Sequence, residues 1–446
     1  MCDEVSPRAL LCPNITHVTF PVIERSVLVT APNPNTGGST AADVPTKPPA
    51  AARGIGPMVG AIFLMATSAI GPGFLTQTSV FTVQMGAAFA FAILLSIIVD
   101  IVIQLNVWRI LGVSGLRASE LANAVLPGLG WFLAILVAIG GLVFNIGNVA
   151  GTGLGVQALT GDTVDPKIGG AISAIIAICV FLWKRAGAAL DVLVGILGAL
   201  MILLMLYVAI SSNPPVAEAM RQSVAPDAVD FKVITTLIGG SVGGYIVFAG
   251  VHRIIDAGHT GPENLDYISR SSVTGIIVTG IMRVLLFLAV LGVVATGVAL
   301  SKDNTAADVF YQAAGDIGRR MFGLVLWAAG LSSVIGASFT SISFLTKQGF
   351  DPKKRGWLTV GFIVISTVIF LFVGSAPQKL LIFAGAFNGL ILPIGFAVVL
   401  YVGFFRKDLL RGYKPPMWML IVGAITLVGC AWMGWSSIST LPKLWA

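Results

Sequence analysis

Residues 64–78 read Leu-Met-Ala-Thr-Ser-Ala-Ile-Gly-Pro-Gly-Phe-Leu-Thr-Gln-Thr, which puts Gly71, Pro72 and Gly73 in the middle of a long apolar run. Proline removes a backbone donor and glycine lowers the cost of unwinding, so this run predicts an interrupted helix. A second apolar run contains Gly-Gly-Ser-Val-Gly-Gly-Tyr at residues 239–245. Each break alone is also explained by a proline kink or by close glycine packing. Two breaks in corresponding places of two halves are instead typical of a transporter built from inverted repeats.

The composition indicates a membrane protein. The chain has 446 residues, of which 56% are hydrophobic and 11% charged, and its mean hydropathy is +0.93. This much apolar surface excludes a soluble globular protein and predicts an all-α polytopic membrane domain, because lipid cannot satisfy free backbone groups outside helices. The net charge of +7 comes from basic residues scattered over short loops, which argues against nucleic-acid binding. Four cysteines without paired spacing predict neither a disulfide framework nor a zinc site.

Eleven apolar runs are long enough to cross a membrane as helices. We expect these spans at residues 57–84, 87–109, 128–159, 168–183, 191–210, 233–259, 273–299, 321–347, 358–374, 380–403 and 417–435. Residues 1–56 predict a disordered cytoplasmic tail without a signal peptide. Residues 57–446 then form a single transporter domain, with repeat one at 57–210, repeat two at 233–403 and an extra helix at 417–435. This is a five-plus-five inverted repeat with discontinuous helices one and six, plus an eleventh helix.

Lysine and arginine residues in alternate loops predict the orientation of the chain. With the N-terminus inside, the inner loops carry fourteen of these residues, while the outer loops and the C-terminus carry eight. We therefore expect a multi-pass protein of the cell membrane with a cytoplasmic N-terminus and an external C-terminus.

Two charged side chains lie well inside the predicted spans. Asp100 is in the second span and Arg283 is in the seventh, and these spans are equivalent in a five-plus-five repeat. An isolated charge in the membrane costs about 2.5–3.5 kcal/mol on insertion scales, so we expect the two to pair. Two interpretations stay open: a proton relay or gate, and a static ion pair between scaffold helices.

The first break, together with Gln-Leu-Asn-Val-Trp-Arg-Ile-Leu-Gly-Val-Ser-Gly at 104–115, resembles the Nramp family of transporters over spans one to ten. The resemblance implies the LeuT-type fold and secondary active transport, which in typical members is proton-coupled uptake of divalent manganese or iron. The family's metal site uses Asp-Pro-Gly-Asn in span one and Met-Pro-His in span six. The matching positions of this chain are Gly71, Pro72, Gly73, Phe74, Gly243, Gly244 and Tyr245. The helix breaks are retained, whereas the metal ligands are replaced.

The groups left at the breaks are backbone N–H and C=O, hydroxyls and one amide. Half-helix N-termini carry free donors and a positive dipole end, which favour a carboxylate over a cation. We therefore predict ion-coupled uptake of a small organic anion. The predicted substrate-binding residues are Gly71, Pro72, Gly73, Phe74, Gln77, Gly243, Gly244 and Tyr245. The resemblance adds Asn388, which is similar to the family's polar position ahead of Leu-Pro in span ten.

The resemblance also bears on the substrate. The form Gly-Pro-Gly-Phe-Leu-Thr-Gln-Thr is similar to a bacterial Nramp-like subgroup associated with 5-oxoproline-degrading gene neighbourhoods. This likeness implies 5-oxoproline or another small carboxylate as the substrate. The alternative, implied by the family at large, is a proton-coupled importer of a divalent cation such as manganese, iron or magnesium.

Other polar residues leave alternatives open. Asn145, Asn148 and Thr152 share one helical face, where they either bridge helices or line the transport path. Span eight is rich in hydroxyls, at Ser332, Ser333, Ser338, Thr340, Ser341 and Ser343. These small residues either serve plain helix packing or, as the resemblance to LeuT-type proteins implies, help form a sodium site with span one, which makes Na+ an alternative to H+ as the coupling ion. The end of span six is either a cytoplasmic gate or a solvated helix end; its polar residues are His252, Arg253 and Asp256.

The sequence assigns no metal ligand and no cofactor. It contains no Walker loop, nucleophile elbow or zinc motif, so neither an ATP-driven pump nor an enzyme is expected. The expected partners are an ion or small-molecule substrate and the lipid bilayer, and the sequence does not predict an oligomeric state.

Overall fold

The computed structural model describes residues 70–346, 350–373 and 376–438, without the side chains at 184–191, 193, 194, 253 and 438. All regular structure in these ranges is helical. The α-helices are α2 (Pro72–Met85), α3 (Phe89–Ser114), α4 (Ala118–Val125), α5 (Leu129–Thr160), α6 (Pro166–Leu182), α7 (Lys184–Ser211), α8 (Val216–Val224), α9 (Phe231–Ser241), α10 (Ile246–Asp256), α11 (Leu265–Ala295), α12 (Thr305–Leu345), α13 (Pro352–Val373), α14 (Pro377–Phe405) and α15 (Met417–Ile438). Three 3-10 turns are η1 (Gly86–Ala88), η2 (Pro262–Asn264) and η3 (Lys407–Leu410). The predicted tail, residues 1–56, lies outside the described residues.

The apolar helices agree with a polytopic membrane protein. Within the described residues, eight helical stretches are long and apolar enough to cross a membrane, and the bent pair Gly195–Ser211 and Val216–Val224 gives up to nine. Two features explain the difference from the eleven predicted spans. The first two spans are separated only by η1 and form one apolar stretch, Pro72–Ser114, and the fourth is a helix of 17 residues, Pro166–Leu182.

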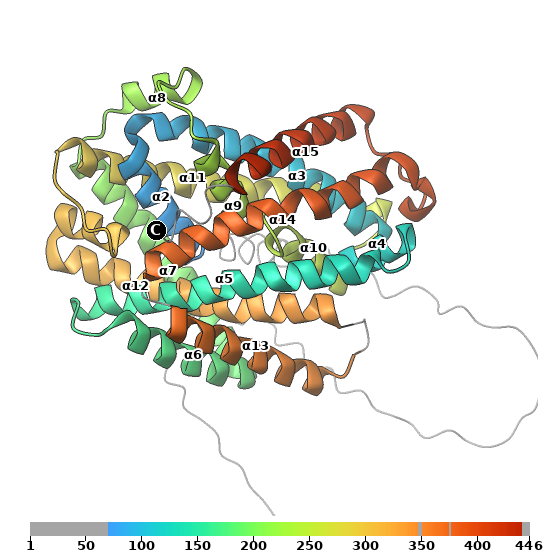
Figure 1. The fold of residues 1–446 in the computed structure, drawn as a ribbon, viewed down its shortest axis with the longest axis horizontal. Coiled ribbons are helices and arrows are strands. Elements are labelled where there is room, and N and C mark those ends of the chain that lie inside the picture. Colours follow the sequence, from blue (N-terminus) through green and yellow to red (C-terminus); the bar gives the residue numbers. More distant parts are fainter. Residues whose placement is uncertain (1–69, 347–349, 374–375, 439–446) are drawn as a thin grey trace, which may run out of the picture. The chain divides into compact units, whose positions relative to one another are not determined.

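Helices that are equivalent in the two predicted repeats pack against each other. Helix α3 packs on α11, α5 on α12, and α6 on α13, which pairs spans two with seven, three with eight and four with nine. Figure 1 shows α5 and α12 running side by side through the centre, with α14 beside α5. This pairing is the arrangement that a five-plus-five inverted repeat produces.

The break in span six is confirmed, because α9 ends at Ser241 and α10 begins only at Ile246. Between them, Gly244 has a φ of +55°, a conformation that glycine adopts at little cost. In span one, α2 begins at Pro72 after an extended Gly71. Proline suits this first helical position because its missing N–H would have no partner in the helix. The first half of this predicted span, 57–69, lies outside the described residues.

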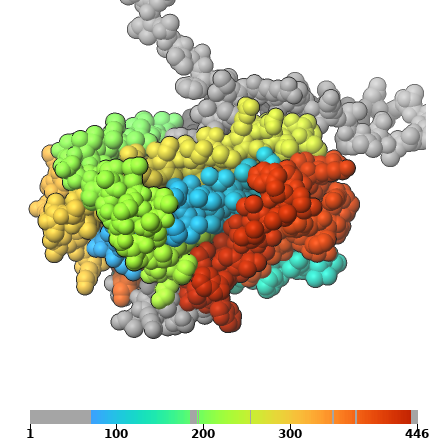
Figure 2. All heavy atoms as spheres, turned by 90° about the horizontal axis from the view of Figure 1, so that it is seen from above, coloured from blue at the N-terminus to red at the C-terminus, as the bar shows by residue number. Residues whose placement is uncertain are grey.

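Large apolar side chains cover the outer surface of the bundle. Helices α3, α11 and α15 form much of the face shown in Figure 2. Their exposed apolar residues include Leu94 and Ile98 on α3, Ile281 on α11 and Ile425 on α15. Such a surface is stable against lipid, so these flanks face the bilayer.

Candidate functional site

The first break places Gly71 at the start of α2, where two polar side chains approach it. A Cβ atom built on Gly71 would lie 3.0 Å from the Oγ of Ser333 and 3.9 Å from the Oδ1 of Asn148. The Ser333 hydroxyl is buried and has no hydrogen-bond partner among the described residues. The space that a side chain at position 71 would enter is therefore bordered by a hydroxyl and an amide.

The second break lies against Asn388 of α14. A Cβ atom on Gly244 would overlap the Asn388 Oδ1, and that oxygen has no hydrogen-bond partner in the described part of the chain. The Asn388 Nδ2 donates to the Gly140 carbonyl at 3.0 Å and to the Ala384 carbonyl at 2.9 Å. The amide is thus held by α5 and α14 with its free oxygen at the break, which is where the sequence places a substrate contact. Gly243 is closely packed, since a Cβ there would overlap the Gly239 carbonyl.

Gln77 connects α2 to the helices around the second break. Its Nε2 donates to the Leu381 carbonyl of α14 at 3.0 Å. Its Oε1, which has no partner within the described ranges, lies beside Gly240, close enough that a Cβ atom there would overlap it. A second free amide oxygen therefore lies near the end of α9.

Helix α5 supplies two side chains between the breaks that the substrate prediction did not include. Phe144 lies 3.8 Å from a Cβ built on Gly73 and packs edge-on against Tyr245, with ring centroids 5.7 Å apart. One turn further, Asn148 lies near Gly71 and interacts with the Tyr245 hydroxyl. The i, i+4 spacing of Phe144 and Asn148 was the available sequence signal for this shared face.

The expected direct pairing of Asp100 with Arg283 is wrong. Both side chains are 3% exposed, but no ion pair within 4.0 Å joins them in the described structure. Arg283 instead donates to the Ser96 Oγ at 3.3 Å and lies over the ring of Phe74, with 4.7 Å from its guanidinium carbon to the ring centroid. Asp100 lies beside Ser241, the last residue of α9. Packing thus gives each charge a different neighbour near a helix break.

The end of span six forms different contacts from those of the predicted gate. Asp256 accepts two hydrogen bonds from Arg117, at 2.7 and 2.9 Å, and the Arg117 side chain is only 6% exposed. His252 accepts from the Ala118 N–H at 3.1 Å through Nε2, which joins α10 to α4 a second time. The side chain of Arg253 lies outside the described residues. Sequence reasoning counted Arg117 only as a loop charge, and no local pattern identified its partner.

A cavity of about 230 Å³ borders this connection. Its lining residues include Arg117, Glu120, Asn123, Trp131 and Phe344. The bonds of Arg117 and His252 therefore join the end of α10 to the start of α4 beside this cavity. Which side of the membrane this end faces follows only from the loop charges and stays a prediction.

The polar residues of spans three and eight separate into two groups. Asn145 donates to Ser338 and Ser366, each at 3.0 Å, and so bridges α5 to α12 and α13. The hydroxyls of Ser332, Ser338 and Ser343 donate to carbonyls of their own helix. This supports the packing interpretation for Asn145, whereas Asn148 faces the breaks. Thr152 donates to the Val149 carbonyl.

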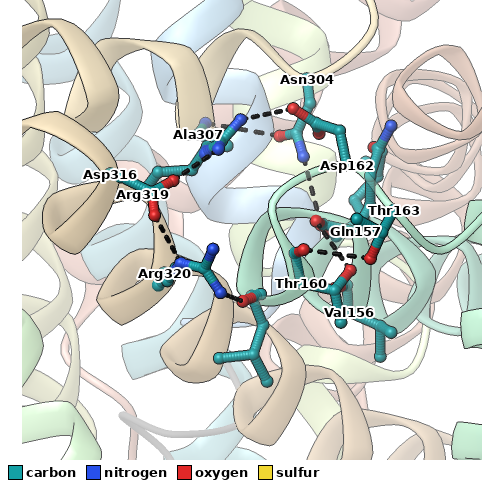
Figure 3. Close-up of polar contacts among 12 residues, drawn as sticks. Val156, Gln157, Thr160, Asp162, Thr163, Asn304, Ala307, Asp316, Arg319 and Arg320 are labelled. Atoms are coloured by element: carbon teal, nitrogen blue, oxygen red, sulfur yellow. Dashed lines mark hydrogen bonds and ion pairs between the residues drawn. The ribbon is translucent and has the colours of Figure 1, made fainter.

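A charged cluster lies at the opposite end of α5. Arg319 of α12 bonds to Asp162, which follows α5, and to Asp316 at 2.5 Å, while Arg320 bonds to Asp316 at 2.6 Å (Figure 3). The cluster follows a non-helical step at Ala314 and Gly315, where α12 is kinked. It connects the part of α12 that follows the kink to the end of span three.

The packing of equivalent helices and the two breaks define a polytopic membrane transporter of the LeuT fold. The chain belongs to the natural resistance-associated macrophage protein-like, or Nramp, family, because the sequence pattern of this family matches residues 62–440. The family resemblance seen in the sequence is thereby confirmed, and the protein is a transmembrane transporter rather than an enzyme. Its substrate is accordingly an ion or a small molecule.

Two relatives match most of the chain. The uncharacterized membrane protein YcsG of Bacillus subtilis is 50% identical over 394 residues, which are 87% of this chain and 96% of that protein. An uncharacterized membrane protein of Haemophilus influenzae is 49% identical over 373 residues, 83% of this chain and 93% of the relative.

Solved structures show the same fold. A manganese transporter of Eremococcus coleocola, in complex with an aromatic bis-isothiourea compound, has a TM-score of 0.68 at 18% identity and covers 86% of each chain. MhsT in complex with L-phenylalanine has a TM-score of 0.58 at 17% identity, over 86% of this chain and 98% of MhsT. At these identities the likeness is evidence for the fold alone.

Proposed function

We propose that this chain is a secondary transporter of a small organic anion that also carries an N–H group, with 5-oxoproline as the candidate substrate. The observation that carries the proposal is the setting of Gly71, where the Ser333 hydroxyl and the Asn148 amide border the start of α2. The hydroxyl can donate, and it stands beside free backbone N–H groups at a helix N-terminus, which favour a carboxylate. The further substrate residues predicted from the sequence remain part of this proposal.

Free groups of opposite hydrogen-bonding character lie at the two breaks. Gly73 and Phe74 are in the first turn of α2, where backbone N–H groups have no partner within the helix. The Oε1 of Gln77 and the Oδ1 of Asn388 are acceptors without partners in the described residues, near the second break. A ligand that carries both a carboxylate and an N–H offers a partner to each set, and a lactam acid such as 5-oxoproline has both groups on adjacent ring atoms.

A divalent cation is the second candidate because the chain belongs to the Nramp family. The amide oxygens of Gln77 and Asn388 are hard ligands of the kind that manganese and magnesium accept. Carboxylates are the stronger ligands for these ions, and the residues at the matching break positions include none. The chemistry of the break residues therefore favours the organic anion.

We propose H+ as the coupling ion, through Asp100, and keep Na+ as the alternative because Ser333 and Ser341 of α12 have hydroxyls without partners in the described ranges. Orientation follows the loop charges, with the N-terminus cytoplasmic and the C-terminus outside. Uptake is then directed inward down the proton gradient.

The proposal is tested by ligand-dependent melting of the purified protein and by uptake into proteoliposomes. A ligand that prefers the folded state raises Tm, so 5-oxoproline should raise it in a concentration-dependent manner while Mn2+ leaves it unchanged. Uptake of labelled 5-oxoproline should then exceed that of empty vesicles. Stabilisation and uptake of Mn2+ without a response to 5-oxoproline or other small carboxylates would overturn the proposal in favour of the cation.

A pair of variants separates site chemistry from stability. Asn388→Ala removes the free oxygen at the break and should abolish the response to 5-oxoproline. Asn106→Ala removes another buried amide, which bonds to the Val102 and Met419 carbonyls, and should lower Tm while leaving the ligand response intact. Equal ligand responses in the two variants would contradict a substrate contact at Asn388.

A further inference from the structure

We infer that Arg283 binds the carboxylate of the substrate and that Phe74 covers its guanidinium in the described structure. The inference deepens the proposed function and rests on it. It gives Arg283 a role in recognising the transported anion, in place of a static pairing with Asp100.

The position of Arg283 links it to the first break. Its guanidinium carbon lies 4.7 Å from the centroid of the Phe74 ring, and Phe74 is the third residue of α2. One Nη donates to the Ser96 hydroxyl at 3.3 Å. The Nε is buried and has no hydrogen-bond partner within the residues that the structure describes. The guanidinium therefore retains a free donor beside the start of α2.

The charge of Arg283 lacks a direct counter-ion in the described structure. The ion pairs there involve other arginines, and Asp100 is not within 4.0 Å. Asp100 acts on this guanidinium only through its charge at longer range, and the close contacts described for it are a hydroxyl and a ring. A buried guanidinium without a close counter-ion is costly, and intramembrane charges of this kind are by default functional. An anion that enters beside Arg283 would neutralise the charge and use its free Nε–H.

The two buried charges occupy related positions in the two repeats. Arg283 of span seven contacts span one at Phe74, and Asp100 of span two lies beside span six at Ser241. In each case the second helix of one repeat carries the charge and meets the broken first helix of the other repeat. The charge is positive in span seven and negative in span two. Arg283 is thus near the N-terminus of α2 and Asp100 near the C-terminus of α9, so each charge lies beside a helix-dipole end of its own sign.

This arrangement is unfavourable when the site is empty and favourable around a ligand with two poles. A carboxylate placed between Arg283 and the start of α2 interacts well with both. An N–H group near the end of α9 can donate to Asp100 or to the free amide oxygen of Gln77. The ligand class is therefore a monocarboxylate that carries an N–H donor.

The test compares an acid with its neutral amide. Binding of 5-oxoproline and of 5-oxoprolinamide to the purified full chain is measured by calorimetry and thermal shift. Wild-type protein should prefer the acid by about ten-fold, since a charge-assisted hydrogen bond is lost with the amide. Arg283→Gln should remove this preference, and Arg283→Lys should retain part of it. Arg109→Gln, which removes an arginine that bonds to Ser269 at 2.8 Å, is the matched control and should keep the full preference.

The outcomes separate the inference from the function on which it rests. No binding of either compound, or of other small carboxylates, by wild-type protein would overturn the proposed function. Equal binding of acid and amide by wild-type protein would overturn the role of Arg283 while leaving a solute transporter. A preference that persists in Arg283→Gln would also overturn it. If Arg283→Gln does not fold, two other measurements test the inference. They are the ratio of acid binding to amide binding in wild-type protein and the reduced ratio expected for Arg283→Lys.

Discussion

The side-chain oxygen of Asn388 occupies the space into which a Cβ atom on Gly244 would project. Gly244 also has a φ of +55°, so an alanine there would be strained and would overlap the amide. We expect Gly244→Ala to abolish substrate binding and to destabilise the protein by more than the roughly 1–3 kcal/mol of backbone strain alone. Thermal unfolding in detergent, with and without 5-oxoproline, measures both effects.

Gly86 offers a matched control for this substitution. It has the same φ of +55°, and a Cβ atom there would meet nothing within 4 Å. Gly86→Ala should therefore cost only backbone strain and leave the ligand response unchanged. If both alanine variants lose the same stability and bind equally well, the contact between Gly244 and Asn388 has no role in the site.

The close approach of Ser333 to Gly71 predicts a paired effect. A Cβ on Gly71 would lie 3.0 Å from the Ser333 Oγ, which is tighter than ordinary packing. Gly71→Ala should weaken substrate binding, with an overpacking cost of about 1–3 kcal/mol, unless Ser333 gives way. Adding Ser333→Ala removes the Oγ and should recover stability, though not the hydrogen bond to the substrate. A double-mutant cycle on Tm and Kd measures the coupling, and purely additive effects would contradict it.

Asp100→Asn tests proton coupling. Asp100 lies inside span two, where the charge of Arg283 on α11 acts on it and where Asp100 in turn acts on the Cys430 thiol on α15. If Asp100 carries the coupled proton, the neutral amide should abolish stimulation of uptake by an imposed pH gradient while binding of substrate persists. Uptake at equal and unequal pH across proteoliposomes measures this, and unchanged pH stimulation would exclude Asp100.

Asp408 supplies the control for that experiment. It lies in η3, outside the spanning helices, and hydrogen bonds from Arg406 lower the pKa of its carboxyl below the ordinary value. The carboxylate therefore stays charged at neutral and mildly acidic pH, so it neither gains nor loses a proton in the transport range. Asp408→Asn should leave pH stimulation intact.

The sequence predicts the breaks because glycine and proline act on the backbone locally. Gly71, Pro72 and Gly244 interrupt their helices through their own conformational properties, and no tertiary information is needed to infer this. The equivalence of spans two and seven was also correct, since α3 packs on α11. The predicted pairing of Asp100 with Arg283 was wrong, because the rotation of each helix about its axis decides which side chains lie next to its charge.

Contacts made by loops were the least predictable part of the site. Arg117 reaches Asp256 across 139 positions of sequence, and no periodic pattern connects a short helix between spans to the end of span six. Similarly, Asn148 shares its helical face with Asn145, yet only Asn148 lies at the breaks. Spacing along a helix selects a face, while the neighbouring helices decide what each member of that face contacts.

The Arg117–Asp256 pair predicts a charge-dependent connection between α4 and α10. Arg117 is buried and Asp256 is half-exposed, so its loss should cost between the value of about 1 kcal/mol for an exposed pair and the roughly 3–5 kcal/mol for a buried one. Asp256→Asn should lower Tm and change the maximal uptake rate rather than substrate Kd. The swap Arg117→Asp with Asp256→Arg should recover part of the loss. A swap no better than the single variants would show that packing, and not charge, holds these helices.

The contacts of Arg319 predict what holds residues 305–313, the segment of α12 before the kink. It bonds to Asp162 and Asp316 and lies 5.1 Å from the centroid of the Tyr311 ring, whereas Arg320 bonds to Asp316 and to the Leu159 carbonyl.

Arg319→Ala should therefore increase the rate of hydrogen exchange in residues 305–313, since it releases both the end of α5 and the Tyr311 ring. Arg320→Ala, which leaves the bonds of Arg319 in place, should have a smaller effect. Hydrogen exchange followed by mass spectrometry measures both variants against wild type. Equal protection from hydrogen exchange in all three proteins would mean that apolar packing alone holds residues 305–313. The charged cluster would then contribute nothing to the stability of this segment.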